Sequence, residues 1–440
     1  MRFEAWRGPA LAFVLLALGV APPSLDGQSG TPAPPHQESP GESGPNSSQA
    51  QAQHYVVLVS LDGFRWDYAE RDGAAHLLAL GKGGAWAPEG MLPSFPALGL
   101  PNQFTVVTGL YPGHHGLVAE SFYGPKRMTH FSAEVEKESV EAYGGVPLWS
   151  LAEDQRMRSA VMGWPGSDSV IAGYPPSYTA EPCNDVQARK CVDMVLRWVH
   201  LAAPERPHFI AIEFFGVDKK AGRFGPDSPE VRTAVLHADD FVGRLKAALD
   251  ASGLPVDLVV VSDRGLAKTE AGWITLDQFT SLNGFKTDGA LLYGHTEQER
   301  ERVYRQLNHV SSLFVVYRRK DLPPDLHMSM NSRIGDPVAI ATGPYAIRAH
   351  APAAGQPDPP PPPGVDDLDP QSQREMKAIF FAAGPDIAPG KTVAPFENVN
   401  LYPWMAHILG LRPPKSDGSL YILAGTLRDD GRDPQDEAEQ

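Results

Sequence analysis

YVVLVSLDG at residues 55–63, HFIAIEFFGVD at 208–218 and DLVVVSD at 257–263 are three short apolar runs. Each run leads directly or within a few residues to an aspartate: Asp62, Asp218 or Asp263. Runs rich in β-branched residues and without polar alternation are typical of strands buried on both faces of a parallel sheet. A single strand-end aspartate is often only a helix cap or turn former. Because ligands bind beyond the carboxyl ends of parallel strands, three in equivalent places predict one shared cleft.

A helical pattern lies between the second and third runs. Val231, Val235, Ala238, Val242, Leu245 and Leu249 recur at steps of three and four residues, which predicts one apolar helix face. Strand, helix and strand in alternation indicate a layered α/β domain with right-handed crossovers.

The first 53 residues read as an export signal and a linker. Arg2 and Arg7 precede an apolar stretch from Ala10 to Ala21, the layout of a secretory signal peptide over residues 1–21. An uncleaved membrane anchor is the alternative, although the stretch is shorter than the roughly 20 apolar residues that span a bilayer. Residues 22–53 contain almost no large apolar side chains, which predicts a flexible linker. We therefore expect an exported protein, periplasmic or extracellular, without an integral membrane segment after cleavage.

The remaining chain reads as one large domain over residues 54–425, with an acidic tail over 426–440. Residues 272–346 are less regular, contain a charged helix near Glu297–Leu307, and are expected to form an inserted cap. A hydrophobic content of 42% suits a substantial core, and a formal charge of −15 argues against a nucleic-acid partner. Cys183 and Cys191 form either a local disulfide or two free thiols; no third cysteine or nearby histidine suggests zinc.

Seven segments make a resemblance to a known family specific. In order they are SLDGFR (60–65), LPNQFTVVTGLYPGHHG (100–116), PLWSLAEDQ to WPGSD (147–168), FGPDSPEV (224–231), VSDRG (261–265), MKAIFFAAGPDI (376–387) and FENVNLYPWMAHILGL (396–411). Together they resemble the nucleotide pyrophosphatase/phosphodiesterase family of the alkaline phosphatase superfamily, from about Tyr55 to Gly418. The resemblance implies a layered α/β/α fold with a largely parallel central sheet and a small inserted cap.

The resemblance also implies two zinc ions and a threonine nucleophile at a helix N-terminus. Asp62, Asp218 and Asp263 match the family's aspartate ligands. The other functional positions differ: Gly99 stands at the nucleophile, Glu120 at the asparagine that binds the phosphoryl oxygens, and Gly222, Arg264 and Asp367 at the three histidine ligands. The substitutions fall on functional positions while the surrounding segments match, which predicts a retained fold and lost chemistry.

Loss of the histidines leaves an oxygen-only set of ligands, which suits Ca²⁺, Mg²⁺ or Mn²⁺ better than zinc. Arg264 adds a permanent charge beside Asp263, and Lys219 and Lys220 follow Asp218. We expect these cations to neutralise the aspartates in place of metal ions; alternatively, the lysines lie on a solvated loop.

A second part of the family pocket matches better. Trp164, Asp168 and Tyr178 lie in the stretch that resembles the pocket wall, where an aromatic ring can stack on a flat ligand. The alternative is that Trp164 and Asp168 only maintain the shape of this loop. His114 and His115 are assigned a structural role.

Two functions follow. The first is an exported pseudoenzyme without a cofactor that binds an unidentified small molecule or protein and does not turn it over. The second is an active metal-dependent phosphodiesterase or phosphohydrolase with a rebuilt carboxylate-rich site, in which one divalent cation activates water beside the three aspartates, Asp366 and Asp367.

Overall fold

The computed structural model describes residues 44–124, 128–132 and 140–429. Its centre is a nine-stranded sheet with the strand order β19-β2-β18-β9-β1-β8-β5-β6, in which β7 also pairs with β8. The strands are β1 (Tyr55–Leu61), β2 (Ala85–Trp86), β5 (Ser159–Met162), β6 (Tyr178–Ala180), β7 (Cys183–Asn184), β8 (Phe209–Phe215), β9 (Val256–Val261), β18 (Phe380–Ala383) and β19 (Lys391–Thr392).

The three apolar runs quoted above are neighbours in this sheet. β1 lies between β8 and β9 and is parallel to both, with Val57 opposite Ile210 and Leu258. β5, β6 and β7 extend the parallel part, whereas β18 is antiparallel to β9 and to β2. The predicted α/β fold with a largely parallel sheet is therefore confirmed.

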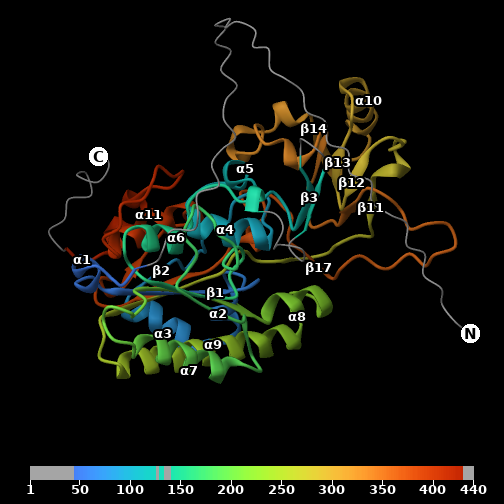
Figure 1. Cartoon of the computed structure of the whole chain (residues 1–440). Helices are drawn as coiled ribbons and strands as arrows, with labels where there is room; N and C mark the ends of the chain where they lie inside the picture. Colours follow the sequence, from blue (N-terminus) through green and yellow to red (C-terminus); the bar gives the residue numbers. More distant parts are fainter. Residues whose placement is uncertain (1–43, 125–127, 133–139, 430–440) are drawn as a thin grey trace, which may run out of the picture. The chain divides into compact units, whose positions relative to one another are not determined.

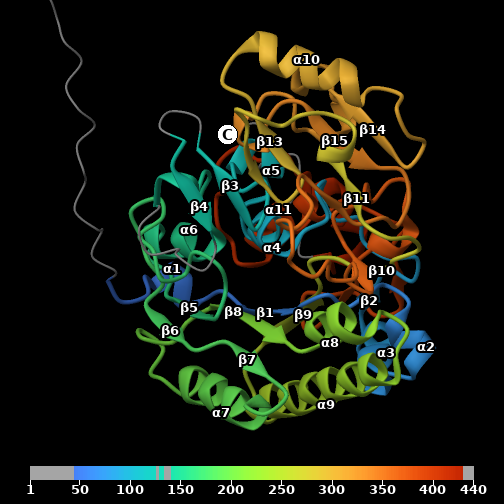
Figure 2. The ribbon, with the colours of Figure 1, turned by 90° about the vertical axis from the view of Figure 1, so that its right-hand side faces the viewer.

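Helices cover both faces of the sheet (Figures 1 and 2). Along β1, Val57 and Val59 pack into one apolar cluster and Val56 and Leu58 into another, because successive side chains of a strand point to opposite faces. The helices of the first face are α2 (Tyr68–Asp72), α3 (Ala75–Gly83), α7 (Ala188–Val199), α8 (Val217–Phe224) and α9 (Pro229–Ala251). Those of the second face are α1 (Ser48–Gln51), α4 (Gly99–Thr108), α6 (Leu148–Asp154) and α11 (Leu401–Ile408), and the short α5 (Pro112–His115) follows α4.

The irregular region after residue 272 has an apolar cluster of its own. Its elements are β11 (Ile274–Thr275), β12 (Lys286–Asp288), β13 (Leu291–Tyr293), α10 (Glu297–Leu307), β14 (Phe314–Tyr317), β15 (Val338–Ala341) and β16 (Ile347–Arg348). Leu292, Val303, Leu307 and Phe314 are buried together there. Five short pairings lie outside the main sheet in the described part of the chain: β3 (Ser121–Tyr123) with β4 (His130–Ser132), β10 (Ala267–Lys268) with β17 (Gly364–Val365), β11 with β16, β12 with β13, and β14 with β15.

The chain before β1 differs from the expected flexible linker over residues 22–53. Asn46 is buried, and its side-chain amide donates to the carbonyl oxygens of Ala203 (2.8 Å) and Arg206 (2.7 Å). Its side-chain oxygen accepts from the backbone of Arg158 at 2.6 Å. A polar side chain with several long-range partners holds an otherwise apolar-poor segment in place. The expected signal peptide and the linker as far as residue 43 lie outside the described residues.

The opposite end of the chain also packs further than the sequence suggested. Thr426 is buried and its hydroxyl accepts from the indole of Trp404 at 3.1 Å. The predicted acidic tail therefore begins after this residue, and residues 430–440 lie outside the described part.

Cys183 and Cys191 form a disulfide with a Cα–Cα distance of 6.1 Å, which joins β7 to α7. None of the helices within residues 44–124, 128–132 and 140–429 is long and apolar enough to cross a membrane.

Candidate functional site

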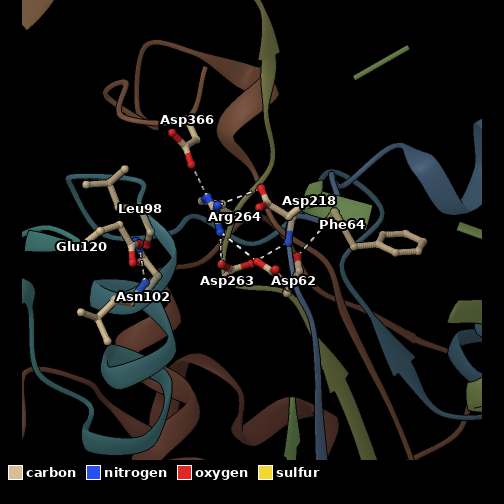
Figure 3. A network of polar contacts seen from close by, with 12 residues as sticks. Asp62, Phe64, Leu98, Asn102, Glu120, Asp218, Asp263, Arg264 and Asp366 are labelled. Atoms are coloured by element: carbon tan, nitrogen blue, oxygen red, sulfur yellow. Dashed lines mark hydrogen bonds and ion pairs between the residues drawn. The ribbon is translucent and has the colours of Figure 1, made fainter. Parts of the chain in front are cut away.

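The three aspartates converge beyond the carboxyl ends of β1, β8 and β9 (Figure 3). The backbone positions them: the amide of Asp62 donates to the carbonyl of Phe214 (3.1 Å), and the amide of Asp218 donates to the carbonyl of Asp62 (3.1 Å). Asp218 lies in the first turn of α8, and Asp263 follows the last residues of β9. The three aspartates thus lie together, but Asp263 is fully buried, and only Asp62 and Asp218 line the cavity described below.

Gly63 permits this close approach. Its φ is +68°, in the left-handed region that favours glycine, and an added Cβ would lie 2.7 Å from the Cβ of Asp218. Its amide donates to the carboxylate of Asp263 at 2.9 Å. The glycine after Asp62 therefore lets the β1 turn touch both of the other aspartates.

Arg264 lies in the middle of these carboxylates. Its guanidinium donates to Asp62 through Nη1 (3.2 Å), to Asp218 through Nη2 (2.9 Å) and to Asp366 through Nε (2.7 Å). It also makes a very short contact through Nη1 with Asp263. Arginine carries a charge that cannot be removed by deprotonation in a protein and presents its donors in a fixed planar fork. One side chain thus joins four carboxylates that come from separate segments.

Negative charge still exceeds positive charge in this cluster. Burial raises the pKa of Asp62 well above its usual range, and the neighbouring Asp218 and Asp263 raise it further despite Arg264. Burial also raises the pKa of Glu213 on β8, with additional contributions from Asp62 and Asp263. Burial opposes the charge of Arg264, yet the four aspartates together raise its pKa. The cluster is therefore held by one permanent cation, and Asp62 and Glu213 within it retain protons more strongly than usual.

The two lysines after Asp218 take no part in the cluster within the described residues. Lys219 lies over the ring of Phe215, at 5.5 Å from its centroid, and Lys220 lies over the ring of Phe224, at 6.0 Å. No ion pair between either lysine and the aspartates is present in the described part of the chain. Of the expected neutralising cations, Arg264 alone fills that role there.

The start of α4 forms the opposite wall. Asn102 is buried and donates to the carbonyls of Ser94 (3.1 Å), Pro96 (2.9 Å) and Leu98 (2.9 Å), which fixes the loop before the helix. The carboxylate of Glu120 accepts from the amide of Leu100 at 2.9 Å. The free amides at a helix N-terminus are where an anion binds, so Glu120 occupies an anion's place with its own side chain.

Gly99 is the first residue of α4 and faces Arg264. A Cβ at this position would lie 2.8 Å from Nη1 of Arg264, 3.2 Å from a carboxylate oxygen of Asp263 and 3.3 Å from one of Glu120. The space that the side chain of a nucleophile would need is thus filled by the guanidinium and its partners.

The two other substituted positions differ in their surroundings. Gly222 lies on α8, one turn after Asp218, with open space around an added Cβ. Asp367 does not contact Arg264; its neighbour Asp366 does. Burial, and then the charge of Asp366, raise the pKa of Asp367 to about 7. The sequence comparison pointed to Asp367, one residue away from the aspartate that joins the cluster.

A cavity of about 1140 Å³ opens beside the cluster. Asp62, Gly99, Glu120, Asp218, Arg264 and Asp366 line one end, and Trp164 and Asp168 line the other. Trp164 is 1% exposed and its indole donates to the carbonyl of Gln103 at 3.0 Å, so most of this ring belongs to the core.

Tyr178 is not among the residues that line the cavity, and its hydroxyl donates to the carbonyl of Glu205 at 2.9 Å. Gln187, which immediately precedes α7, lines it together with Lys190 and Met194 of α7 and Phe215 of β8. Sequence reasoning missed these four, although the spacing of 187, 190 and 194 is that of one helix face.

Neither histidine of the 100–116 segment lines the cavity. His115 is buried and its Nε2 lies 3.0 Å from the hydroxyl of Thr105 on α4. His114 contacts Asp417 at 2.7 Å, on the surface.

Comparison with known proteins shows which family this chain belongs to. Residues 56–358 match the family model described as type I phosphodiesterase / nucleotide pyrophosphatase. The chain belongs to this family. An uncharacterized pyrophosphatase/phosphodiesterase of Schizosaccharomyces pombe is 32% identical over 398 residues, covering 86% of this chain and 81% of the relative. Human ectonucleotide pyrophosphatase/phosphodiesterase family member 7 is 28% identical over 420 residues, covering 90% and 88%.

Solved structures of this family support the same fold. Murine ectonucleotide pyrophosphatase/phosphodiesterase 5 matches with a TM-score of 0.78 and 25% identity, over 85% of this chain and 100% of the murine chain. An inactive form of the same murine protein in complex with AMP matches with the same TM-score over 86% of this chain. The fold is therefore that of the alkaline phosphatase superfamily, and none of these relatives indicates a nucleic-acid partner.

The two zinc ions implied by this family do not fit the residues at the cluster. Zinc in such sites prefers nitrogen ligands beside carboxylates, whereas the positions of the histidines hold a glycine, an arginine and an aspartate. The guanidinium of Arg264 is within hydrogen-bonding distance of Asp62, Asp218 and Asp263, so a divalent cation among them would meet a fixed positive charge.

Proposed function

We propose that this family member is a pseudoenzyme, an exported protein that binds a small molecule or a segment of another protein and does not hydrolyse phosphodiesters. The observation that carries the proposal is the position of Arg264, which donates to Asp62, Asp218 and Asp366 and contacts Asp263. A water nucleophile needs a metal ion or a base to lower its pKa, and the guanidinium stands where that metal would have to lie.

The anion side of the site supports the same proposal. Glu120 is hydrogen-bonded to the amide of Leu100 at the start of α4, so its carboxylate competes with a phosphoryl group for the helix terminus. Gly99 offers no side chain for attack on phosphorus. Cation, anion and nucleophile positions are thus each altered, and the cavity of about 1140 Å³ beside them remains available for a ligand.

Export is proposed on the signal-like residues 1–21 and on the disulfide between Cys183 and Cys191, which suits an oxidising compartment. The ligand is a small molecule or a protein segment that tolerates a carboxylate-rich surface at one end of the cavity.

The first experiment measures hydrolysis of bis-p-nitrophenyl phosphate and ATP by the purified protein with Zn²⁺, Mn²⁺ and Ca²⁺ in turn. We expect no metal-dependent turnover. A matched gain-of-function variant combines Gly99→Thr, Glu120→Asn, Gly222→His and Arg264→His with either Asp366→His or Asp367→His. We expect zinc-dependent hydrolysis from one of these two variants, because each supplies the nucleophile and the nitrogen ligands together.

Turnover by the wild-type protein that requires a metal and disappears in Asp62→Ala would contradict the proposal. It would favour the second function, a hydrolase with a rebuilt carboxylate-rich site that uses one divalent cation.

A further inference from the structure

A second cluster of ionisable side chains lies at the opposite ends of the central strands, away from the cluster around Arg264. His54 immediately precedes β1, Asp257 is the second residue of β9, and Asp386 follows β18, which runs in the opposite direction. These positions are at the amino-terminal ends of the parallel strands, whereas the aspartates around Arg264 lie beyond the carboxyl ends. The cluster therefore belongs to a different part of the molecule from the family's site.

The three side chains are close enough to share one ion. One ligand atom from each, an imidazole nitrogen or a carboxylate oxygen, lies within 4.8 Å of the other two. Nδ1 of His54 lies 2.7 Å from Oδ2 of Asp386. Bond lengths of about 2.0–2.2 Å place the ligands of a tetrahedral zinc ion roughly 3 to 4 Å apart, so small side-chain movements bring all three onto one ion.

Asp257 supplies the observation that points to a ligand. The residue is 0% exposed, and its Oδ1 accepts from the backbone amide of Asp386 at 3.0 Å. Within the described residues its Oδ2 has no hydrogen-bond partner. A buried carboxylate oxygen without a partner is costly, and the carboxylate of Asp386 beside it adds repulsion. Either a proton or a cation has to lie between these two groups.

The surroundings favour a cation with access from solvent. The side chains of His54 and Asp386 are 39% and 21% exposed, so an ion can enter from the surface and keep a water molecule as its fourth ligand. Arg428 lies near Asp257, but no ion pair joins it to either carboxylate in the described part of the chain.

We propose that His54, Asp257 and Asp386 form a binding site for one divalent transition-metal ion of the zinc type. Zinc binds both imidazole nitrogen and carboxylate oxygen, and a site with three protein ligands leaves the fourth position to water. The ion would join the start of β1, the start of β9 and the segment after β18, and so stabilise the sheet. This site is independent of the proposed function, since it shares no residue with the cavity.

The test is zinc binding by the whole protein. After removal of metals with a chelator, zinc is titrated in by calorimetry, and the thermal midpoint is measured with and without zinc. We expect one zinc ion per chain and a higher midpoint. In His54→Ala and Asp386→Asn we expect the affinity to fall by roughly 100-fold or more, because loss of a ligand exceeds the 10–100-fold effect of losing its supporting contacts.

Two controls separate this site from others. His114 contacts Asp417 at 2.7 Å with side-chain exposures of 44% and 21%, which closely matches the His54–Asp386 pair, but without a third buried carboxylate. His114→Ala should therefore leave zinc binding unchanged. Asp62→Asn should also leave it unchanged, since that residue belongs to the cluster around Arg264.

Absence of zinc binding, or binding that survives His54→Ala, would overturn the proposal. Stability that does not respond to zinc and rises in Asp386→Asn would also overturn it, because the two carboxylates would then share a proton and no ion.

Discussion

The position of the Arg264 side chain and the presence of glycine at residue 99 depend on each other. The guanidinium fills the volume that any side chain at residue 99 would need, and three carboxylates on neighbouring segments keep it there. The lack of a side chain at residue 99 and the presence of the arginine are therefore one structural feature, and a change at either position would disturb the other.

The two glycines at substituted family positions give a direct test of this dependence. Gly99→Ala should destabilise the protein by about 1–3 kcal/mol, because its Cβ would lie 2.8 Å from a guanidinium nitrogen that cannot move freely. Gly222→Ala should stabilise it by about 0.5–1 kcal/mol, since α8 has open space there and alanine favours a helix. Urea unfolding of both variants measures this difference in stability. If the two variants are equally stable, the side chain of Arg264 can move away from the new Cβ at little cost in free energy.

Sequence reasoning at this scale succeeded where the chain is regular. Asp62, Asp218 and Asp263 end or follow strands, so their convergence followed from strand direction. Asp366 was missed as the partner of Arg264 because it lies in an irregular stretch after β17, where no regular element shows which of the adjacent aspartates, Asp366 or Asp367, reaches the cluster. Tyr178 was expected near the ligand, but nothing in the pattern of a three-residue strand showed that its hydroxyl would reach Glu205.

At the scale of elements, the packing of α5 against α4 depends on a neutral histidine. His115 is buried against Phe104 and contacts the hydroxyl of Thr105. Burial lowers the pKa of His115 from 6.5 to about 3. The folded protein therefore resists protonation at this position, whereas the unfolded chain accepts a proton near pH 6.5.

This difference predicts a stability that depends on pH. Between pH 6.5 and about 3 the unfolded state binds more protons at His115, so stability falls as the pH is lowered through this window. The contribution is at most about 1.4 kcal/mol per pH unit. Denaturant unfolding at several pH values should show a shallower slope for His115→Gln, while Thr105→Val lowers stability and keeps the wild-type slope. Identical slopes in the wild-type and His115→Gln proteins would contradict the assignment.

Long elements were predicted better than short ones. β1, β8, β9, α9 and α10 were expected from runs or periods of six or more residues, or from a run of charged helix formers. The edge formed by β18, β2 and β19, in which β18 is antiparallel to β9 and β2 and β19 is parallel to β2, was not expected, because strands of two to four residues carry too little pattern to distinguish them from loops.

At the scale of the whole molecule, the domain starts earlier than the sequence suggested. Asn46 bonds to residues about 160 positions away in the chain, and Ala50 packs into the core. A segment of polar and small residues gave no sign of this, since its attachment rests on one buried amide and one short helix.

The boundary can be tested by truncation. A chain that begins at residue 54 should be less stable than one that begins at residue 44 by about 2 kcal/mol or more, because it loses the hydrogen bonds of Asn46 and the burial of Ala50. Thermal unfolding measures the difference, and Asn46→Ala in the longer chain should reproduce much of it. Equal unfolding midpoints for the two truncated chains would instead support the prediction that residues 44–53 belong to a flexible linker.

The attachment of Asn46 also decides how this protein can be displayed. The first described residues pack beside those that precede β8, at the amino-terminal ends of the parallel strands. The cavity opens past the carboxyl ends of the same strands. A bead, sensor surface or fusion partner attached at residue 44 would thus lie at the end of the strands that faces away from the cavity mouth. Screening for the unknown ligand on protein immobilised through this end should leave the binding face free.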